Sequence, residues 1–178
     1  ADDVAVKLDF PYFIDKEAPV SRARSLMEYR CGFRARKRGS QVDFTLIVGV
    51  PVKSLCPCSK AISDYGAHNQ RSQVVVELQS STFVWIEDVV TAVEACASSP
   101  VFALLKREDE KWVTERAYDN PRFVEDLVRD VLIASRRLPG VRSVRVSAEN
   151  FESIHNHSAY ATLHWEEQTA RPEQLALE

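Results

Sequence analysis

Apolar and polar residues alternate along four separate stretches in the first half of the chain. The alternation covers residues 4–12, 27–35, 42–50 and 74–78. Successive side chains of a strand point to opposite faces of a sheet, so a period of two indicates a strand with one buried face. The pattern therefore predicts four half-buried strands.

The second half of the chain adds two stretches with helical spacing and two more alternating stretches. Apolar residues recur every three to four positions over residues 84–97 and 121–132. The second of these helices is expected to have Asn120 as its N-cap and a proline as its first residue. Alternation returns over residues 141–146 and 159–165, which predicts two final strands.

The order of these elements points to a fold class. Residues 41–166 read as strand, strand, helix, helix, strand, strand, and two further strands precede them. Separate runs of strands and helices are typical of α+β proteins with an antiparallel sheet and helices on one face. Residues 53–71 show no clean period, and a loop of that length inside a domain is usually either functional or disordered.

Composition and charge narrow the context. The 178 residues are 45% hydrophobic and 28% charged with a net charge of −3, which suits one sizeable core and excludes fibrous, coiled-coil and wholly disordered classes. No apolar run approaches the ~20 residues of a membrane span, and the start has no basic and apolar leader. We expect a cytoplasmic protein that binds no membrane and, given its mild acidity, no nucleic acid.

The first group of chemically capable residues lies in the long loop. Cys56 and Cys58 are one residue apart, a spacing that strains a disulfide, so reduced thiols are expected. A thiolate of this pair and the His68 imidazole can both bind zinc or iron. Two interpretations stay open on the residues alone: a metal site, or small loop residues beside a surface histidine.

A second group lies between the last two predicted strands. His155 and His157 are two positions apart, so in extended backbone they point the same way and can share a task. With Asn156 they form a His-Asn-His tripeptide similar to a nuclease metal motif. That tripeptide is too short to be specific and its surroundings are acidic, so a metal-dependent nuclease is the weakest interpretation.

A third group lies between and within the two predicted helices. Residues 104–111 mix basic and acidic side chains, which is typical of a solvated connection. The same residues could instead complete a metal site with one carboxylate, bind a substrate with another and hold phosphate with the basic side chains. Glu125 lies one turn inside the second helix. A carboxylate there is favoured by the helix dipole and can equally point into a pocket.

Together these groups resemble the prokaryotic type IB GTP cyclohydrolases. The resemblance runs from about residue 10 to residue 165, and its blocks are SLCPCSK (54–60), GAHNQRS (66–72), LLKR (104–107), NP with FVED (120–126) and ENFESIHNHS (149–158). It implies hydrolytic opening of GTP at guanine C8, giving 7,8-dihydroneopterin triphosphate and formate at the start of folate biosynthesis. The alternative is another purine or pterin enzyme of the same fold, or a non-catalytic purine- or pterin-binding protein.

The resemblance also implies an architecture. Such proteins adopt the tunnelling fold (T-fold), in which an antiparallel sheet with a helix pair on one face assembles into barrels. Residues 1–38 would be the last two strands of an N-terminal module whose other elements are absent from this chain, residues 39–166 a complete C-terminal module, and residues 167–178 a polar tail. We expect a homo-oligomer, a homotetramer, with active sites at the subunit interfaces.

The roles of the metal-site residues follow from the matched motifs alone. The resemblance implies Cys56, His68 and Glu110 as ligands of one divalent metal per site, with zinc, manganese and iron all open. Cys56 would also belong to the catalytic set. His155 would lie beside the metal as a proton-transfer residue or an additional ligand, and His157 would join it in the catalytic set.

The roles of the substrate-binding residues follow in the same way. Glu125 would correspond to the carboxylate that anchors the guanine. The triphosphate needs cations, and the candidates are Lys60, Arg71 and Lys106, with Arg107 and the Arg22 and Arg24 pair as further basic residues.

Overall fold

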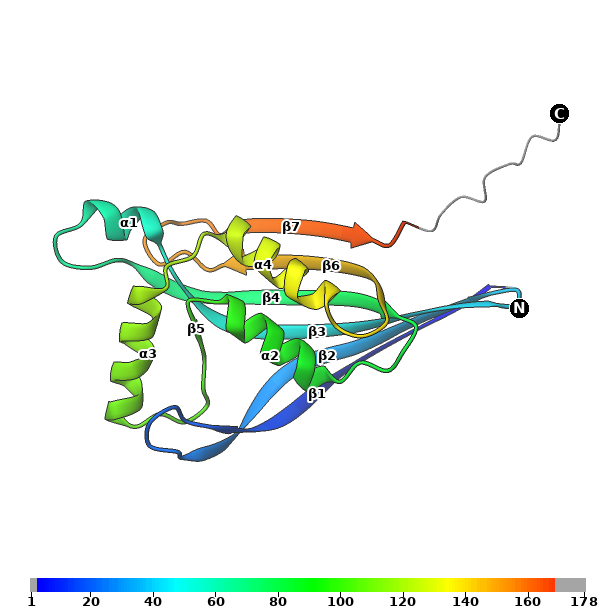
Figure 1. The fold of residues 1–178 in the computed structure, drawn as a ribbon, viewed down its shortest axis with the longest axis horizontal. Coiled ribbons are helices and arrows are strands. Elements are labelled where there is room, and N and C mark those ends of the chain that lie inside the picture. The colour runs from blue at the N-terminus through cyan, green and yellow to red at the C-terminus, as the bar shows by residue number, and fades with distance from the viewer. Residues whose placement is uncertain (1–2, 169–178) are drawn as a thin grey trace.

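A computed structural model describes residues 3–168 of the chain. Its strands form one antiparallel sheet in the order β1-β2-β3-β4-β6-β7, with the short β5 paired to β3 (Figure 1). The predicted α+β class with an antiparallel sheet is confirmed. The elements are β1 (Asp3–Glu17), β2 (Arg24–Arg38), β3 (Gln41–Leu55), α1 (Pro57–Ile62), β4 (Asn69–Ser80), α2 (Ile86–Cys96), β5 (Ser99–Pro100), α3 (Arg107–Asp119), α4 (Val124–Arg136), β6 (Val141–Asn150) and β7 (Ala159–Glu166).

The alternating stretches form the predicted strands, and most strands extend beyond the predicted bounds. β1 and β2 pair over their whole lengths. Gly39 turns the chain from β2 into β3 with a φ of +57°, a left-handed conformation that costs glycine little. β3 continues through Pro51 to Leu55, and β4 already begins at Asn69. The long loop expected at residues 53–71 is therefore limited to the stretch between these two strands.

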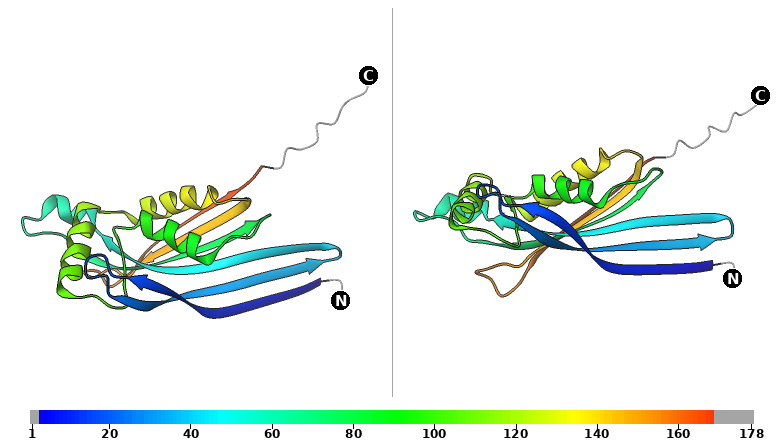
Figure 2. Two further views of the ribbon diagram at one scale, coloured as in Figure 1. Left: turned by 60° about the horizontal axis from the view of Figure 1, so that its bottom comes forward. Right: turned by 90° about the horizontal axis from the view of Figure 1, so that it is seen from below.

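The core lies between one face of the sheet and two helices. α2 contacts β3, α4 contacts β6 and β7, and the two helices contact each other on the same side of the sheet (Figures 1 and 2). Inward-facing side chains of the strands meet the apolar stripes of both helices in one cluster. Its fully buried members include Tyr29, Val48, Val50, Val52, Val74, Val76, Val89, Val93, Leu127, Val128, Val131 and Val144.

The boundary of the second predicted helix differs from the expectation. α4 begins at Val124 with Phe123 at its N-cap, so the prediction of Asn120 as N-cap was wrong. Asn120 is instead the C-cap of α3, and its side-chain amide donates to the Ala97 carbonyl at 2.8 Å. Proline is common just after a helix as well as at its first position, so the Asn-Pro pair fits either end.

A buried ion pair joins the β1–β2 hairpin to the helix layer. Lys16 Nζ donates to Glu94 Oε1 at 2.6 Å, and Tyr29 donates its hydroxyl to the same oxygen at 2.9 Å. The Lys16 and Glu94 side chains are 13% and 14% exposed. Burial lowers the pKa of Lys16, and Glu94 opposes that shift. The two buried charges pair with each other and make further hydrogen bonds, which offset the free-energy cost of removing them from water. The pair therefore fixes the hairpin against α2.

A second buried carboxylate ties the turn after β1 to the start of α3. Asp109 is fully buried, and its Oδ1 accepts the backbone N–H groups of Val20 and Ser21, each at 2.9 Å. Its Oδ2 accepts the Ser21 hydroxyl at 2.6 Å and the Lys106 N–H at 2.8 Å. Burial alone would raise the pKa of Asp109, but these hydrogen bonds outweigh it and hold the pKa well below its usual range.

Replacing Asp109 by asparagine is expected to lower the melting temperature at pH 7 by roughly 5 °C or more, because an amide NH₂ then faces backbone donors. The folded-state pKa lies below the unfolded value of about 3.9, so the ionised carboxylate stabilises the fold above that pH. The difference between wild type and Asp109→Asn should therefore shrink as the pH falls below about 4. Glu108→Gln, an exposed acid in the same first turn, is the control. Equal melting temperatures for wild type and Asp109→Asn at pH 7 would contradict the anchoring role.

The ends of the chain add little to this description. The predicted polar tail, residues 167–178, lies almost entirely outside the described residues, and the proposed division at residue 38 stays a prediction. Between residues 3 and 168, no helix is both long and apolar enough to cross a membrane.

Candidate functional site

Hydrogen bonds close the loop between β3 and β4 and hold Cys56 beside His68. The Cys56 N–H donates to the His68 carbonyl at 3.1 Å, and the His68 N–H donates to Ser59 Oγ at 3.2 Å. Ser59 donates its hydroxyl to the Cys56 carbonyl at 3.2 Å, and its N–H is directed at Cys56 Sγ at 3.5 Å. The structure thus brings two of the predicted metal ligands together, and Ser59, which sequence reasoning did not single out, links them.

The His68 ring is held by two residues that sequence reasoning also missed. His68 Nδ1 lies 3.1 Å from Gln70 Oε1 and 3.8 Å from Glu152 Oε2. Gln70 Nε2 donates to Glu152 Oε1 at 3.4 Å. Gln70 and Glu152 fall inside the matched blocks at residues 66–72 and 149–158, and that position was the signal that could have found them.

The two predicted catalytic histidines lie on the turn between β6 and β7. His155 and His157 are exposed, and their rings stack with centroids 5.1 Å apart. The His155 ring meets the His68 ring edge-on, with centroids 6.4 Å apart. The structure therefore places three of the four histidines of the chain at one end of the sheet.

Glu125 lies at the same end of the sheet, in the first turn of α4. The Arg122 N–H donates to the Leu55 carbonyl at 3.0 Å, which fixes the start of α4 beside the residue that precedes Cys56. Glu125 is exposed, and its carboxylate has no hydrogen-bonding partner among the described residues. The carboxylate is therefore available to bind a ligand.

Two of the predicted phosphate-binding residues also lie here. Arg71 is exposed near the start of β4, and its carbonyl accepts the Phe151 N–H at 3.1 Å, which joins β4 to the turn that carries the histidines. Lys60 Nζ donates to the Tyr118 carbonyl and lies 4.1 Å from the centroid of the Tyr118 ring. The Lys60 ammonium is thus engaged with α3, whereas Arg71 presents a cation at the surface.

Glu110 and Lys106 lie elsewhere. The sequence interpretation placed Glu110 in a connection between helices, but it is an exposed residue of the first turn of α3. Lys106 is the N-cap of that helix. Lys60 contacts this helix at Tyr118, which is eight residues after Glu110 and about 12 Å further along the helix axis. The structure does not bring these two residues to Cys56 within one chain.

The residues at the Cys56 end fit a divalent metal in chemical type but not in number. A thiol and an imidazole are good ligands for zinc and iron. Over residues 3–168, however, the single chain contains no group of three or more His, Cys, Asp or Glu side chains placed to hold a metal ion. Among the described residues, Cys56 and His68 are therefore the two predicted metal ligands that lie beside each other, and Glu110 is not among them.

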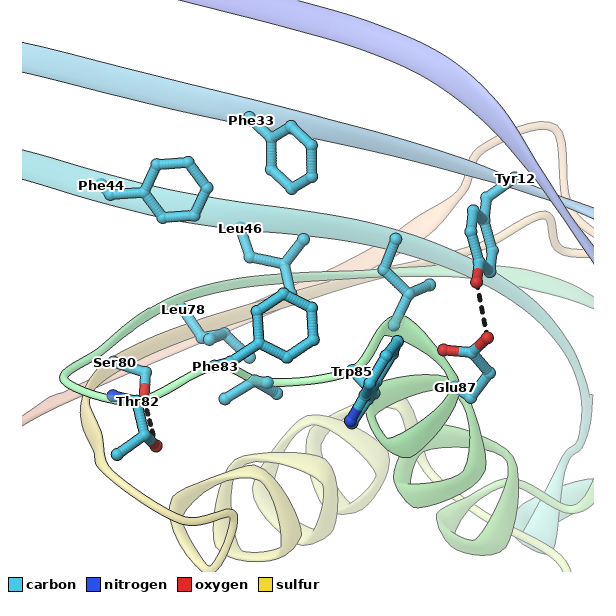
Figure 3. Close-up of a pocket in the computed structure, with 12 residues that line it drawn as sticks. Tyr12, Phe33, Phe44, Leu46, Leu78, Ser80, Thr82, Phe83, Trp85 and Glu87 are labelled. Atoms are coloured by element: carbon cyan, nitrogen blue, oxygen red, sulfur yellow. Dashed lines mark hydrogen bonds between the residues drawn. The ribbon is translucent and has the colours of Figure 1, made fainter.

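A separate cavity of about 450 Å³ lies on the helix-bearing face of the sheet, beside the start of α2 (Figure 3). Tyr12 donates its hydroxyl to Glu87 Oε1 at 2.5 Å at one end of it, and Glu87 Oε2 is buried without a partner in the described part of the chain. None of the predicted site residues lines this cavity. Its walls are mainly apolar and include Phe33, Phe44, Leu46, Leu78, Phe83 and Trp85.

Fold and site define an α+β protein with a thiol–imidazole pair and a histidine turn at one end of an open antiparallel sheet. A family model described as type I GTP cyclohydrolase folE2 matches residues 1–161. The chain belongs to this family.

Curated relatives agree with the family match. The chain is 60% identical over 164 residues to a GTP cyclohydrolase FolE2 of Syntrophotalea carbinolica and 57% identical over 163 residues to one of Citrifermentans bemidjiense. Each alignment covers 92% of this chain and 61% of the relative. The Geobacter sulfurreducens protein of the same name is 55% identical over 170 residues, covering 96% of this chain and 66% of that protein. The chain thus spans about three fifths of the length of the curated relatives it matches.

Among solved structures, one titled "Crystal structure of highly active BTUO mutant P287G without dehydration" aligns with 93% of this chain and 65% of that chain. The TM-score is 0.44 and the sequence identity 8%, so this likeness bears on neither fold nor function.

Proposed function

We propose that the protein is a metal-dependent GTP cyclohydrolase that opens the guanine ring at C8 and releases formate and 7,8-dihydroneopterin triphosphate. The observation that carries the proposal is the Cys56–His68 pair, closed by backbone hydrogen bonds, in a chain of the type I GTP cyclohydrolase folE2 family. Relatives named GTP cyclohydrolase FolE2 share 55% to 60% of its residues. The reaction would open folate biosynthesis.

Cys56 and His68 would hold a zinc, manganese or iron ion. A divalent metal with an open position lowers the pKa of bound water towards ~7 and so supplies hydroxide at neutral pH. The chain's own contribution is to keep both donors in place through the Ser59 and backbone contacts. His155 would give a proton to a purine nitrogen bonded to C8 as water adds to C8, and would regain a proton from the added hydroxyl as the C8–N bond breaks, because its ring lies next to that of His68. The stacked ring of His157 would limit the orientations of His155.

Glu125 would select guanine over adenine. Its exposed carboxylate can accept hydrogen bonds from guanine N1–H and from the 2-amino group at the same time. Adenine has neither donor at these positions, so it would leave the carboxylate unpaired and bind poorly.

Arg71 is the cation best placed for the triphosphate, because it is exposed and joined through its backbone to the histidine turn. Lys60 would have to leave Tyr118 to reach a phosphate. Lys106, at the far end of α3, would serve a phosphate only if that end of the helix also meets a substrate.

The chain would adopt the T-fold and assemble into a barrel-forming homo-oligomer, a homotetramer. In the described part of the chain the sheet is open, and the outer edges of β1 and β7 have no strand partner. A long unpaired edge strand tends to pair with another chain, and closing a barrel removes such edges. Copies that join edge to edge would therefore give the outer edges of β1 and β7 hydrogen-bonding partners.

The site itself would be shared between copies. Glu110 and Lys106 lie together at the start of α3, while Cys56 and His68 lie at the opposite end of the helix. If the start of α3 in one copy meets the Cys56 end of another, Glu110 supplies the ligand that a single chain lacks. The same contact brings in Lys106 as a cation for the triphosphate.

This sharing predicts that two inactive variants restore each other. His68→Ala and Glu110→Ala, each inactive alone, should regain up to about a quarter of wild-type GTP turnover when co-expressed in equal amounts, because a random oligomer then contains intact composite sites. The control mixture combines Cys56→Ala with His68→Ala. Both residues lie at the same end of the proposed shared site, so every site lacks one of them and activity should not return. Failure of the first mixture to recover would place Glu110 in the site of its own chain or outside the site.

The proposed activity is tested with purified protein, GTP and Zn²⁺, Mn²⁺ or Fe²⁺ in turn. Reducing conditions keep Cys56 and its neighbour Cys58 as thiols, since an oxidised Cys56 cannot bind metal. We expect fluorescent pterin after oxidation of the product. No product with any of the three metals would overturn the proposal.

A further inference from the structure

We propose that Gln70 and Glu152 are positioning residues that keep the proton of the His68 imidazole on Nδ1 and leave the lone pair on Nε2. Contacts within the chain determine the tautomer, and its consequence for metal binding rests on the proposed function.

The three side chains form a closed group. Gln70 Oε1 lies 3.1 Å from His68 Nδ1, and Gln70 Nε2 lies 3.4 Å from Glu152 Oε1. The second oxygen of Glu152 lies 3.8 Å from His68 Nδ1. Gln70 is 8% exposed, and the His68 and Glu152 side chains are 12% and 11% exposed. Water has little access to the group, so each polar atom depends on its protein partners.

The orientation of the Gln70 amide follows from the carboxylate. An ionised carboxylate only accepts hydrogen bonds, so Glu152 requires the NH₂ group of Gln70 to face it. The flipped amide would set its oxygen against the carboxylate and its NH₂ against the ring. Glu152 therefore turns the Gln70 oxygen towards His68.

The tautomer of His68 follows from the amide. An amide oxygen only accepts, so the ring nitrogen opposite it has to carry the proton. The neutral imidazole then donates from Nδ1 and keeps its lone pair on Nε2. The nearby Glu152 Oε2 favours the same arrangement, because its negative charge stabilises a proton on Nδ1.

Backbone pairing fixes the members of the group relative to one another. Gln70 lies opposite Ser54 in the β3–β4 ladder, two residues before Cys56. Glu152 follows Phe151, whose N–H is bound to the Arg71 carbonyl at 3.1 Å. The group therefore sits between two rigid strands and the histidine turn, and it can present Nε2 of His68 as a preformed metal ligand.

The tautomer can be read directly from the metal-free full chain. Protein labelled with ¹⁵N-histidine gives four imidazole systems, and His68→Gln identifies the one that belongs to His68. Long-range ¹H–¹⁵N correlation spectra at about pH 8.5, well above the ordinary histidine pKa of about 6.5, show which ring nitrogen carries the proton. We expect Nδ1–H for wild type and a shift towards Nε2–H or a mixture in Gln70→Leu and in Glu152→Gln. Wild-type protein with the proton on Nε2, or a Gln70→Leu spectrum equal to wild type, would overturn the proposal.

Zn²⁺ affinity, measured by competition with a chelator, supplies the second readout. Gln70→Leu keeps the size of the side chain and is expected to weaken Zn²⁺ binding by about 10-fold to 100-fold. Gln73→Leu, on the same strand but outside the group, should bind like wild type. Equal Zn²⁺ affinity in Gln70→Leu and wild type would overturn the positioning role. A wild-type protein that binds Zn²⁺ but does not turn over GTP would overturn the proposed function and leave the tautomer result in place.

Discussion

Replacing His68 by alanine is expected to remove both the bound divalent metal and the turnover of GTP. His68 and Cys56 are the two proposed ligands that lie beside each other within one chain, so the loss of His68 removes one of them and weakens the hold on the metal. We expect kcat/KM to fall by at least about 1,000-fold, since hydroxide at neutral pH depends on the metal. Metal content by elemental analysis and GTP turnover are measured on the same preparation.

His164→Ala is the matched control. His164 is exposed on β7 and its ring lies 3.2 Å from the Ser143 hydroxyl, away from the other three histidines. This variant should keep wild-type metal content and turnover. A His68→Ala protein that keeps its metal would contradict the assignment of His68 as a ligand, and a His164→Ala protein that loses metal would show that the loss is not specific to the site.

Glu125→Ala is expected to lower GTP turnover severely while the metal stays bound. Its carboxylate lies in the first turn of α4 and has no partner among the described residues, so its removal takes away a substrate contact without touching Cys56 or His68. Losing a bidentate charged contact to guanine should lower kcat/KM by on the order of 100-fold or more. The measurement pairs GTP turnover with metal content.

Asp126→Ala separates guanine recognition from a helix-dipole effect. Asp126 is the second acid of the same first turn and pairs with Arg129 at 2.6 Å. If the acids matter only through the helix dipole, both variants lose stability equally and neither loses turnover specifically. Loss of metal in Glu125→Ala would instead show that the division between substrate and metal residues is wrong.

The strands were predictable because a half-buried sheet imposes its period on the sequence. Each predicted strand is present, and β1 to β4 extend beyond the predicted ends. The helix α3 was missed because its apolar stripe is narrow: Val113 and Ala117 are its buried apolar residues, and its first turn is charged. A helix held mainly by a buried carboxylate, Asp109, leaves little hydrophobic pattern to detect.

The site residues also divide into those that the sequence indicates and those that it does not. Cys56 and His68 were singled out by residue type and assigned as ligands through the matched motifs, and the structure places them beside each other. Ser59, Gln70 and Glu152 act through hydrogen bonds across a loop and between strands, which no local period reports. Glu110 was assigned to a connection because its neighbours are charged, and its helix became visible only in three dimensions.

Hydrolytic removal of guanine C8 at the Cys56–His68 site can be followed as formate released from GTP labelled with ¹⁴C at C8. Wild type and Cys56→Ala are compared with the metal present and the thiols reduced. We expect wild type to release one labelled formate for each pterin formed and Cys56→Ala to release none. Labelled formate from both proteins at similar rates would contradict it, as would pterin formation without labelled formate.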